Sequence, residues 1–256
     1  MTTLEELLTT ELPLVVAHRG ASGNAPENTA AAIRLALDAG ARMMEIDVQI
    51  TRDGEVVVFH DSTLDRTSSG TGEIRNFTYR RLCDLDAGSW FAEGFAGEQI
   101  PRLVDLFAMV RGKACLNVEI KPPATGEDWR KRIDLIAAVT RDASMTAHTL
   151  FSSFHHDSLR YLQSLDNAFH TAALLPPDSQ LLPSDILRQT GCKGFVCALN
   201  QLTEERIADI AAKNIFTGVY TINSENQLKK AMKAKVHAIV TDFPELMISL
   251  LHQGCK

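Results

Sequence analysis

The chain has 256 residues, 45% of them hydrophobic, which fits one large globular domain with a substantial core. Its formal net charge of −6, without a cluster of lysine and arginine, disfavours nucleic acid as a partner. Glu5 and Glu6 stand where a secretory signal would carry basic residues, and no apolar run approaches the roughly 20 residues that span a bilayer. We therefore expect a cytoplasmic protein without stable membrane association.

Short apolar, β-branched segments alternate with longer amphipathic segments along the whole chain. The predicted strands span residues 14–17, 43–50, 115–120, 149–152, 171–175, 194–199, 217–222 and 238–241. The predicted helices span residues 28–39, 103–111, 129–141, 158–164, 183–189, 204–213, 225–233 and 244–250. Alternation of this kind requires parallel strands with right-handed crossovers, and eight units in about 250 residues are typical of a (β/α)8 barrel. The prediction is an α/β fold, a TIM barrel, rather than an open doubly wound sheet.

One stretch breaks the alternation. Residues 61–102 separate a hairpin-like strand at 55–59 from the next helix, and they are rich in glycine, serine and charged residues. This stretch is too long for a loop between a strand and a helix. We expect one domain over residues 1–256, with a small insertion after the second strand that lies over one edge of the barrel mouth.

Charged residues gather where predicted strands end. His18 follows the first strand, and Glu45 and Asp47 lie two residues apart on the second, so that both carboxylates point to the same face. Glu119 and Lys121 repeat this spacing on the third. The active site of a barrel forms at the carboxyl ends of its strands, so these side chains are expected to meet there.

Three inward carboxylates would repel one another strongly in a partly dry pocket. A divalent cation is the simplest remedy, and ligation by oxygen atoms suits Mg²⁺ or Ca²⁺ better than zinc. The alternative is a set of structural ion pairs with Lys121 and Arg19, the two basic residues available nearby.

A phosphodiester is the substrate that suits such a site. The cation would bind one phosphate oxygen, and Arg19 and Lys121 would add positive charge. His18 and His60 supply groups able to take a proton from a nucleophile and to give one to a leaving alkoxide. Either histidine could instead be a core residue, but both stand at predicted strand ends beside charged residues.

A series of short motifs runs in order across most of the chain. They are HRG at 18–20, PENT at 26–29, EID at 45–47, FHD at 59–61, LDRTSSGTG at 64–72, VEIK at 118–121, SSF at 152–154, VYTIN at 219–223 and VTDFP at 240–244. With these motifs the chain resembles the bacterial glycerophosphodiester phosphodiesterases.

The resemblance implies a barrel enzyme that hydrolyses compounds such as glycerophosphocholine or glycerophosphoethanolamine to sn-glycerol 3-phosphate and an alcohol. It implies an attack by the 2-hydroxyl of the glycerol, which forms a cyclic phosphate that water then opens. Carried over to this sequence, it makes His18 and His60 the catalytic pair. The metal ligands that it implies, for one Mg²⁺ or Ca²⁺ ion, are Glu45, Asp47 and Glu119.

The remaining assignments concern the rim of the site. The resemblance places Arg19 and Lys121 on the phosphate, with Glu27 supporting Arg19 or the metal shell. Trp90 is predicted to pack on the glycerol side of the substrate, although it could equally plug the insertion against the barrel. Arg66 is expected to organise the insertion through ion pairs, and Asp242 to cap the helix that begins at Pro244.

Two alternative functions remain open at this stage. One is a phospholipase-type phosphodiesterase acting on intact lipid, which would need an exposed apolar rim, whereas residues 61–102 are mostly polar. The other is a barrel that binds phosphodiesters without catalysis, which would be marked by loss of a histidine or a ligand carboxylate. A homodimer is possible, and a small molecule is the expected partner.

Overall fold

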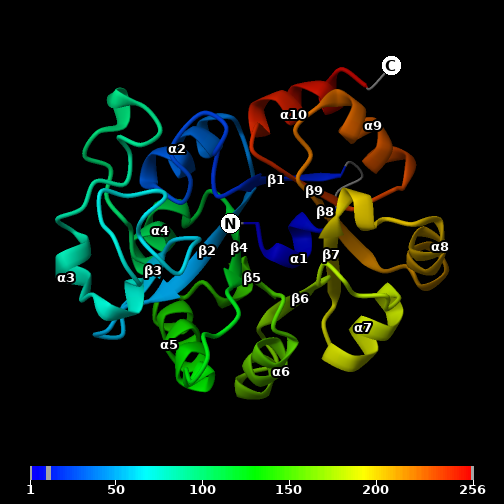
Figure 1. Cartoon of the computed structure of the whole chain (residues 1–256). Helices are drawn as coiled ribbons and strands as arrows, with labels where there is room; N and C mark the ends of the chain where they lie inside the picture. Colours follow the sequence, from blue (N-terminus) through cyan, green and yellow to red (C-terminus); the bar gives the residue numbers. More distant parts are fainter. Residues whose placement is uncertain (1, 10–12, 255–256) are drawn as a thin grey trace.

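The computed structural model describes residues 2–9 and 13–254, and within them eight parallel strands form a closed barrel (Figure 1). Each strand pairs with the next around the ring, and β1 pairs with both β2 and β9, which closes the sheet. The barrel strands are β1 (Leu14–His18), β2 (Met43–Ile50), β4 (Cys115–Ile120), β5 (Thr149–Ser153), β6 (His170–Leu174), β7 (Gly194–Ala198), β8 (Phe216–Tyr220) and β9 (Ala238–Thr241). The predicted TIM barrel is confirmed.

A ring of helices surrounds the strands, one in each crossover between barrel strands and one after the last strand (Figure 1). They are α2 (Ala30–Asp38), α4 (Leu103–Val110), α5 (Trp129–Asp142), α6 (His156–Leu165), α7 (Pro183–Thr190), α8 (Glu204–Lys213), α9 (Glu225–Lys233) and α10 (Pro244–His252). Each coincides with a predicted helix to within two residues at either end. Their amphipathic pattern therefore located them correctly.

The two faces of the strands have different chemistry. On β2, Ile46 and Val48 point outward and are fully buried in the main hydrophobic core, which fills the space between the strands and the helices. Glu45 and Asp47 alternate with them and point into the barrel. Because successive side chains of a strand face opposite ways, the apolar residues that hold the helices in place also direct the carboxylates inward.

The predicted insertion forms a small lobe beside the barrel (Figure 1). Strand β3 (Val56–Val58), which leads into the insertion, pairs antiparallel with β2, and the insertion contains η1 (Ile74–Asn76), α3 (Tyr79–Leu82) and η2 (Glu93–Phe95). A separate apolar cluster holds this lobe together, including Val57, Leu64, Ile74, Leu82 and Ile100.

Helix α1 (Leu4–Leu7), which has a single turn, was not predicted. Four residues are too few for a periodic pattern, although Thr3 and Glu6 form a capping box. Leu4 and Leu7 are buried against Val16 and Met43 inside the barrel. Since these residues lie at the amino ends of β1 and β2, α1 closes the end of the barrel opposite the predicted site.

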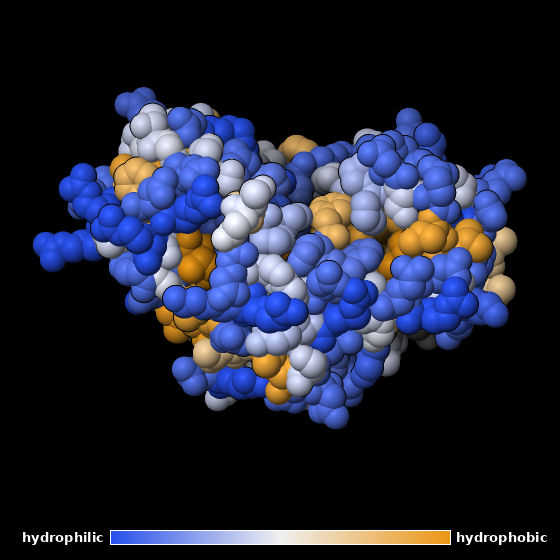
Figure 2. Space-filling model, turned by 60° about the horizontal axis from the view of Figure 1, so that its bottom comes forward, coloured by the Kyte–Doolittle hydropathy of each residue, from blue (hydrophilic) through white to orange (hydrophobic). Residues whose placement is uncertain are grey.

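The face of the molecule in Figure 2 is largely hydrophilic, with hydrophobic residues in separate patches. Within the described residues, no helix combines the length and apolar character needed to cross a membrane.

Candidate active site

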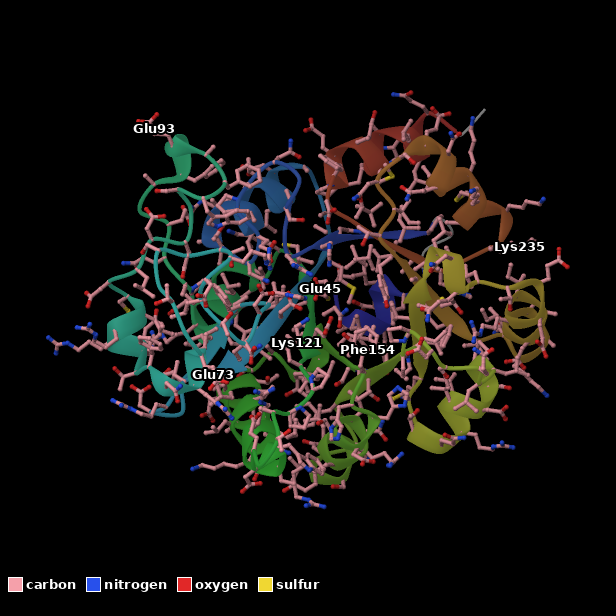
Figure 3. The ribbon with its side chains drawn as sticks, viewed as in Figure 1. Glu45, Glu73, Glu93, Lys121, Phe154 and Lys235 are labelled. Carbon is pink, nitrogen blue, oxygen red and sulfur yellow. The ribbon has the colours of Figure 1, made fainter. Side chains whose placement is uncertain are left out.

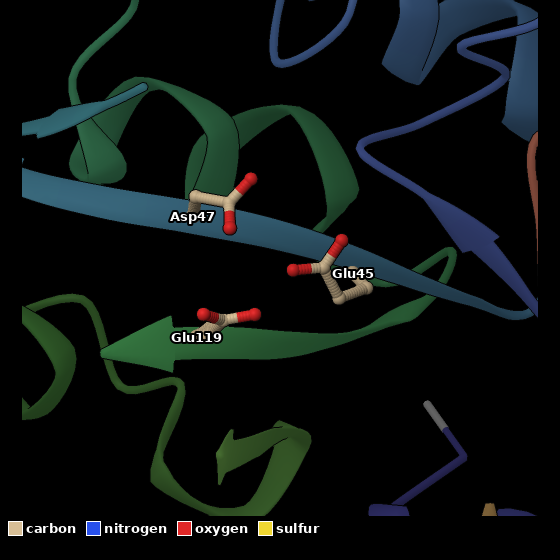
Figure 4. Close-up of side chains that lie close together, drawn as sticks. All are labelled: Glu45, Asp47 and Glu119. Atoms are coloured by element: carbon tan, nitrogen blue, oxygen red, sulfur yellow. The ribbon is translucent and has the colours of Figure 1, made fainter. Parts of the chain in front are cut away.

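Three carboxylates converge on neighbouring strands at the mouth of the barrel (Figure 4). Asp47 on β2 is paired in register with Glu119 on β4, and Glu45 lies two residues before Asp47. One oxygen from each carboxylate lies within 4.8 Å of the others, close enough to share one metal ion. The i, i+2 spacing on adjacent strands produces this triad.

Two basic side chains neutralise part of the negative charge. Lys121 Nζ lies 2.5 Å from Asp47 Oδ1 and 2.7 Å from Glu119 Oε1. Arg19 Nε lies 3.4 Å from Asp47 Oδ2, while its Nη1 donates to Glu27 Oε1 at 2.6 Å. Within the described part of the chain, these pairs serve Asp47 and Glu119 and leave Glu45 without an ion pair to a lysine or arginine side chain.

Glu45 has weaker charge compensation than the other two carboxylates, since its ionic contact is with His18, whose Nε2 lies 3.9 Å from Glu45 Oε2. Its Oε2 accepts the Arg19 backbone N–H at 3.0 Å, but its buried Oε1 has no hydrogen-bond partner among the residues that the structure describes. Burial, followed by the charge of Asp47, raises the pKa of Glu45 to about 8. Burial also opposes ionisation of Asp47, but Lys121 and then Arg19 outweigh it and lower that pKa. An orphaned oxygen beside two further carboxylates fits a divalent cation.

The HRG motif forms the tight turn that places Arg19 beside Glu45 and Asp47. Arg19 has a φ of +55°, in the left-handed region, and this conformation points its N–H at Glu45. Gly20 follows with a φ of +80°, and a Cβ atom there would lie 2.6 Å from the backbone carbon of Ala32. The close approach of α2 therefore requires glycine at this position.

His18 is oriented from the far end of the chain. Its Nδ1 lies 2.6 Å from Asp242 Oδ1, and Asp242 also accepts from Asn223 Nδ2 at 2.6 Å and Ser22 Oγ at 3.0 Å. Burial disfavours the imidazolium, but the hydrogen bond with Asp242 and the charge of Glu45 outweigh it and raise the pKa of His18.

The prediction that Asp242 caps α10 was wrong. Phe243 is the N-cap residue, and no side chain caps this helix. Asp242 is held instead in the network with His18.

His60 has a similar partner, supplied by the next residue. Its Nδ1 lies 2.5 Å from Asp61 Oδ1, and Asp61 also accepts two hydrogen bonds from the Arg66 guanidinium. The other side of that guanidinium donates twice to Glu27, which accepts in turn from Arg19. The prediction that Arg66 forms ion pairs is confirmed, and these pairs tie the insertion to the site.

A cavity of about 260 Å³ opens between these groups. Its lining includes His18, Arg19, Glu45, His60, Asn117, Glu119, Lys121, Ser152, Phe154, Leu174, Val196, Tyr220, Thr221 and Val240. Glu45, Lys121 and Phe154 lie towards the middle of the barrel, whereas Glu93 and Lys235 lie at the periphery (Figure 3). The charged lining residues lie on or directly after β1, β2 and β4 and in the segment after β3, whereas β6, β7 and β9 contribute the apolar Leu174, Val196 and Val240.

Trp90 does not line this cavity. It lies in the insertion with its side chain 40% exposed, and its indole N–H donates to the Ala87 carbonyl at 2.9 Å. Its ring makes an edge contact with Phe91. A role for Trp90 in substrate binding stays a prediction.

Some residues of the site had not been assigned from the sequence. Asn28 of the PENT motif donates to Asp47 Oδ2 at 2.8 Å and accepts the Asp47 backbone N–H at 3.2 Å. Asp61 and Asp242 stand inside recognisable motifs, FHD and VTDFP, and this was the available signal. Their partners became visible only in the folded chain.

Comparisons with known proteins agree with this geometry. A sequence model described as the glycerophosphoryl diester phosphodiesterase family matches residues 18–246. A glycerophosphodiester phosphodiesterase of Caldanaerobacter subterraneus subsp. tengcongensis is 35% identical over 248 residues, covering 94% of this chain and 98% of the relative.

Solved structures give the same result. A phosphodiesterase of Oleispira antarctica, in complex with the product sn-glycerol-3-phosphate, superposes with a TM-score of 0.86 at 30% identity, covering 94% of this chain and 97% of that one. A glycerophosphodiester phosphodiesterase of Agrobacterium tumefaciens str. C58 gives a TM-score of 0.80 at 32% identity, with coverage of 93% and 100%. The chain therefore belongs to the glycerophosphoryl diester phosphodiesterase family.

Proposed function

We propose that this protein hydrolyses glycerophosphodiesters, such as glycerophosphocholine and glycerophosphoethanolamine, to sn-glycerol 3-phosphate and an alcohol, using one Mg²⁺ or Ca²⁺ ion. The observation that carries the proposal is the pair of histidines, each held at Nδ1 by a carboxylate, that line one cavity with Glu45 and Glu119 of the acidic triad. The product bound to the Oleispira antarctica relative supports the substrate class.

Substrate binding follows from the distribution of charge. Glu45, Asp47 and Glu119 would hold the cation, which supplies Lewis-acid stabilisation to a phosphate oxygen when bound. Arg19 and Lys121 bring positive charge to the same side of the cavity. The apolar side chains opposite suit the carbon atoms of the substrate.

Proton transfer falls to the two histidines. One takes the proton of the glycerol 2-hydroxyl as that oxygen attacks phosphorus, and the bond from phosphorus to the alcohol oxygen breaks. The other gives its proton to the departing alcohol. Water then opens the cyclic phosphate with the two roles reversed, so that the sum is addition of one water. Because Nδ1 of each ring is bonded to a carboxylate, Nε2 is the nitrogen available for this work.

The first experiment measures release of sn-glycerol 3-phosphate from glycerophosphocholine. Protein stripped with EDTA is resupplied with Mg²⁺, with Ca²⁺ or with neither. Release that needs a cation supports the proposal, and the better ion identifies the cofactor. Absence of release from folded protein with either ion would contradict it, and release of head group from phosphatidylcholine vesicles alone would favour the phospholipase-type alternative.

Variants of the histidines test the mechanism. His18→Ala and His60→Ala should each fold and lose about 10²- to 10⁴-fold in kcat, the usual contribution of a general acid or base. His252→Ala, in an exposed position on α10, is the matched control and should keep its activity. A substrate with 2-deoxyglycerol should be inert, and its turnover at the normal rate would exclude attack by the 2-hydroxyl.

A further inference from the structure

A second cavity lies inside the barrel, at the end opposite the candidate active site. Its volume is about 140 Å³, and its walls include residues near the amino ends of the strands together with Glu5 and Leu8 at helix α1. Helix α1 lies in the centre of the strand ring in Figure 1 and closes this end of the barrel. None of the residues assigned above to catalysis, metal or phosphate binding lines this cavity.

The cavity exists because inward-facing residues on four adjacent strands are very small. Ala172 on β6 is paired in register with Gly194 on β7, and Gly218 on β8 is paired with Ala238 on β9. All four line the cavity. The interior of a TIM barrel is normally filled by layers of bulky, branched side chains, and two pairs of glycine and alanine cannot fill it.

The buried apolar residues around this space form two separate clusters. One joins α1 to β1, β2 and β9 and includes Leu14, Val16 and Met43. The other joins β6 and β7 and comprises Ala172, Leu174 and Val196. Residues of both clusters line the cavity, which therefore lies between them, where a continuous core would otherwise run.

Polarity decides what this space would hold. Most of the wall is apolar. The charged lining residues Glu5 and Lys193 are exposed and His170 is half-buried, so these three mark its outer end, and the Thr171 hydroxyl accepts a hydrogen bond from Gln163. Asn117 makes the inner end polar, because its buried Oδ1 has no hydrogen-bond partner in residues 2–9 and 13–254. Apolar cavities of about 150 Å³ in proteins remain dry and bind benzene or xenon.

We propose that this end of the barrel is a second ligand site, which binds a small apolar molecule, or the end of an alkyl chain, of about six carbon atoms. Asn117, Val196 and Val240 line both this cavity and the candidate active site. A bound molecule would therefore lie directly beneath the floor of the active site. The proposal does not depend on the reaction assigned to that site.

Benzene is the probe, and the melting temperature is the measurement. A ligand that binds only the folded state raises the free energy of unfolding as its concentration increases. A benzene concentration of about ten times Kd should therefore raise Tm by about 4 °C for a chain of this size. Gly218→Val should abolish the shift, because its side chain would occupy the cavity. A Cβ atom at this glycine would lie 3.4 Å from Val196 Cγ2, an ordinary contact.

Gly94→Val is the matched control, since a Cβ atom there meets nothing within 4 Å and Gly94 lies in the insertion. Its shift with benzene should equal that of the wild type. If Gly218→Val does not fold, as judged by circular dichroism, Ala172→Val takes its place. No shift in the wild-type protein, or an equal shift in the cavity-filling variant, would overturn the proposal.

Discussion

The Arg66 guanidinium connects both halves of the candidate site, so its removal is the most informative single change. It donates to Asp61 at 2.7 and 3.0 Å and to Glu27 at 2.9 and 2.7 Å. Asp61 holds His60, and Glu27 holds Arg19. In Arg66→Gln both carboxylates lose this common anchor, and we expect His60, the proposed catalytic residue, and Arg19, the proposed phosphate ligand, to lose their positions together.

The stability and activity effects should differ in size. The Arg66 side chain is 45% exposed, and exposed ion pairs each contribute about 0.5 kcal/mol, so the loss of two pairs should cost about 1 kcal/mol. That corresponds to about 2–4 °C in Tm for a chain of this length. Misplacement of reacting groups by about 1 Å can cost 10²-fold in rate, so kcat/KM should fall by about 10- to 100-fold.

The assay is steady-state hydrolysis of glycerophosphocholine, with Tm measured on the same samples. Arg75→Gln is the matched control, because Arg75 makes a bidentate ion pair with Glu73 in the same insertion and this pair does not include Asp61 or Glu27. It should stay within about twofold of wild type, as expected for an exposed pair. Arg66→Lys should have only part of the wild-type activity, because the lysine ammonium lacks the planar set of N–H donors with which the guanidinium binds two carboxylates. Wild-type kcat/KM in Arg66→Gln, or an equal loss in the control, would refute the reasoning.

Three further predictions concern single groups. Asp242→Asn should lower kcat by at least about 10²-fold with little change in KM, because His18 loses the carboxylate that stabilises its protonated form; an unchanged kcat would contradict this. Glu45→Gln should weaken Mg²⁺ or Ca²⁺ binding in isothermal titration calorimetry by about tenfold or more, and equal affinity would remove Glu45 from the ligand set. Arg66 and then His60 hold the pKa of Asp61 at about 2, below its ordinary 3.8, so its charge stabilises the fold above pH 4 and this contribution disappears as the pH falls towards 2. Urea unfolding should show a loss of about 1 kcal/mol over that range, after allowance for solvent screening. The loss should be smaller in Arg66→Gln, where His60 alone still lowers the pKa of Asp61.

The barrel could be predicted because its determinants are local. Each strand is a short β-branched segment and each helix a longer amphipathic one, and these periods are visible in any window of the sequence. The same local geometry predicted the carboxylate triad, since residues two apart on a strand share a face. Short helices such as α1 and α3 were not predicted, because four residues are too few to show a helical repeat of apolar side chains.

What the sequence alone determined was the order of elements, the inward direction of Glu45, Asp47 and Glu119, and the family through its motifs. The tertiary structure decided which partners these residues meet. Asp242 contacts His18, 224 positions away in the sequence, because β9 pairs with β1 and closes the barrel. A short segment of sequence does not show which strands will pair in this way. The cavity beneath α1 has the same origin: glycine and alanine are unremarkable one at a time, and they leave a space only when four adjacent strands bring them together.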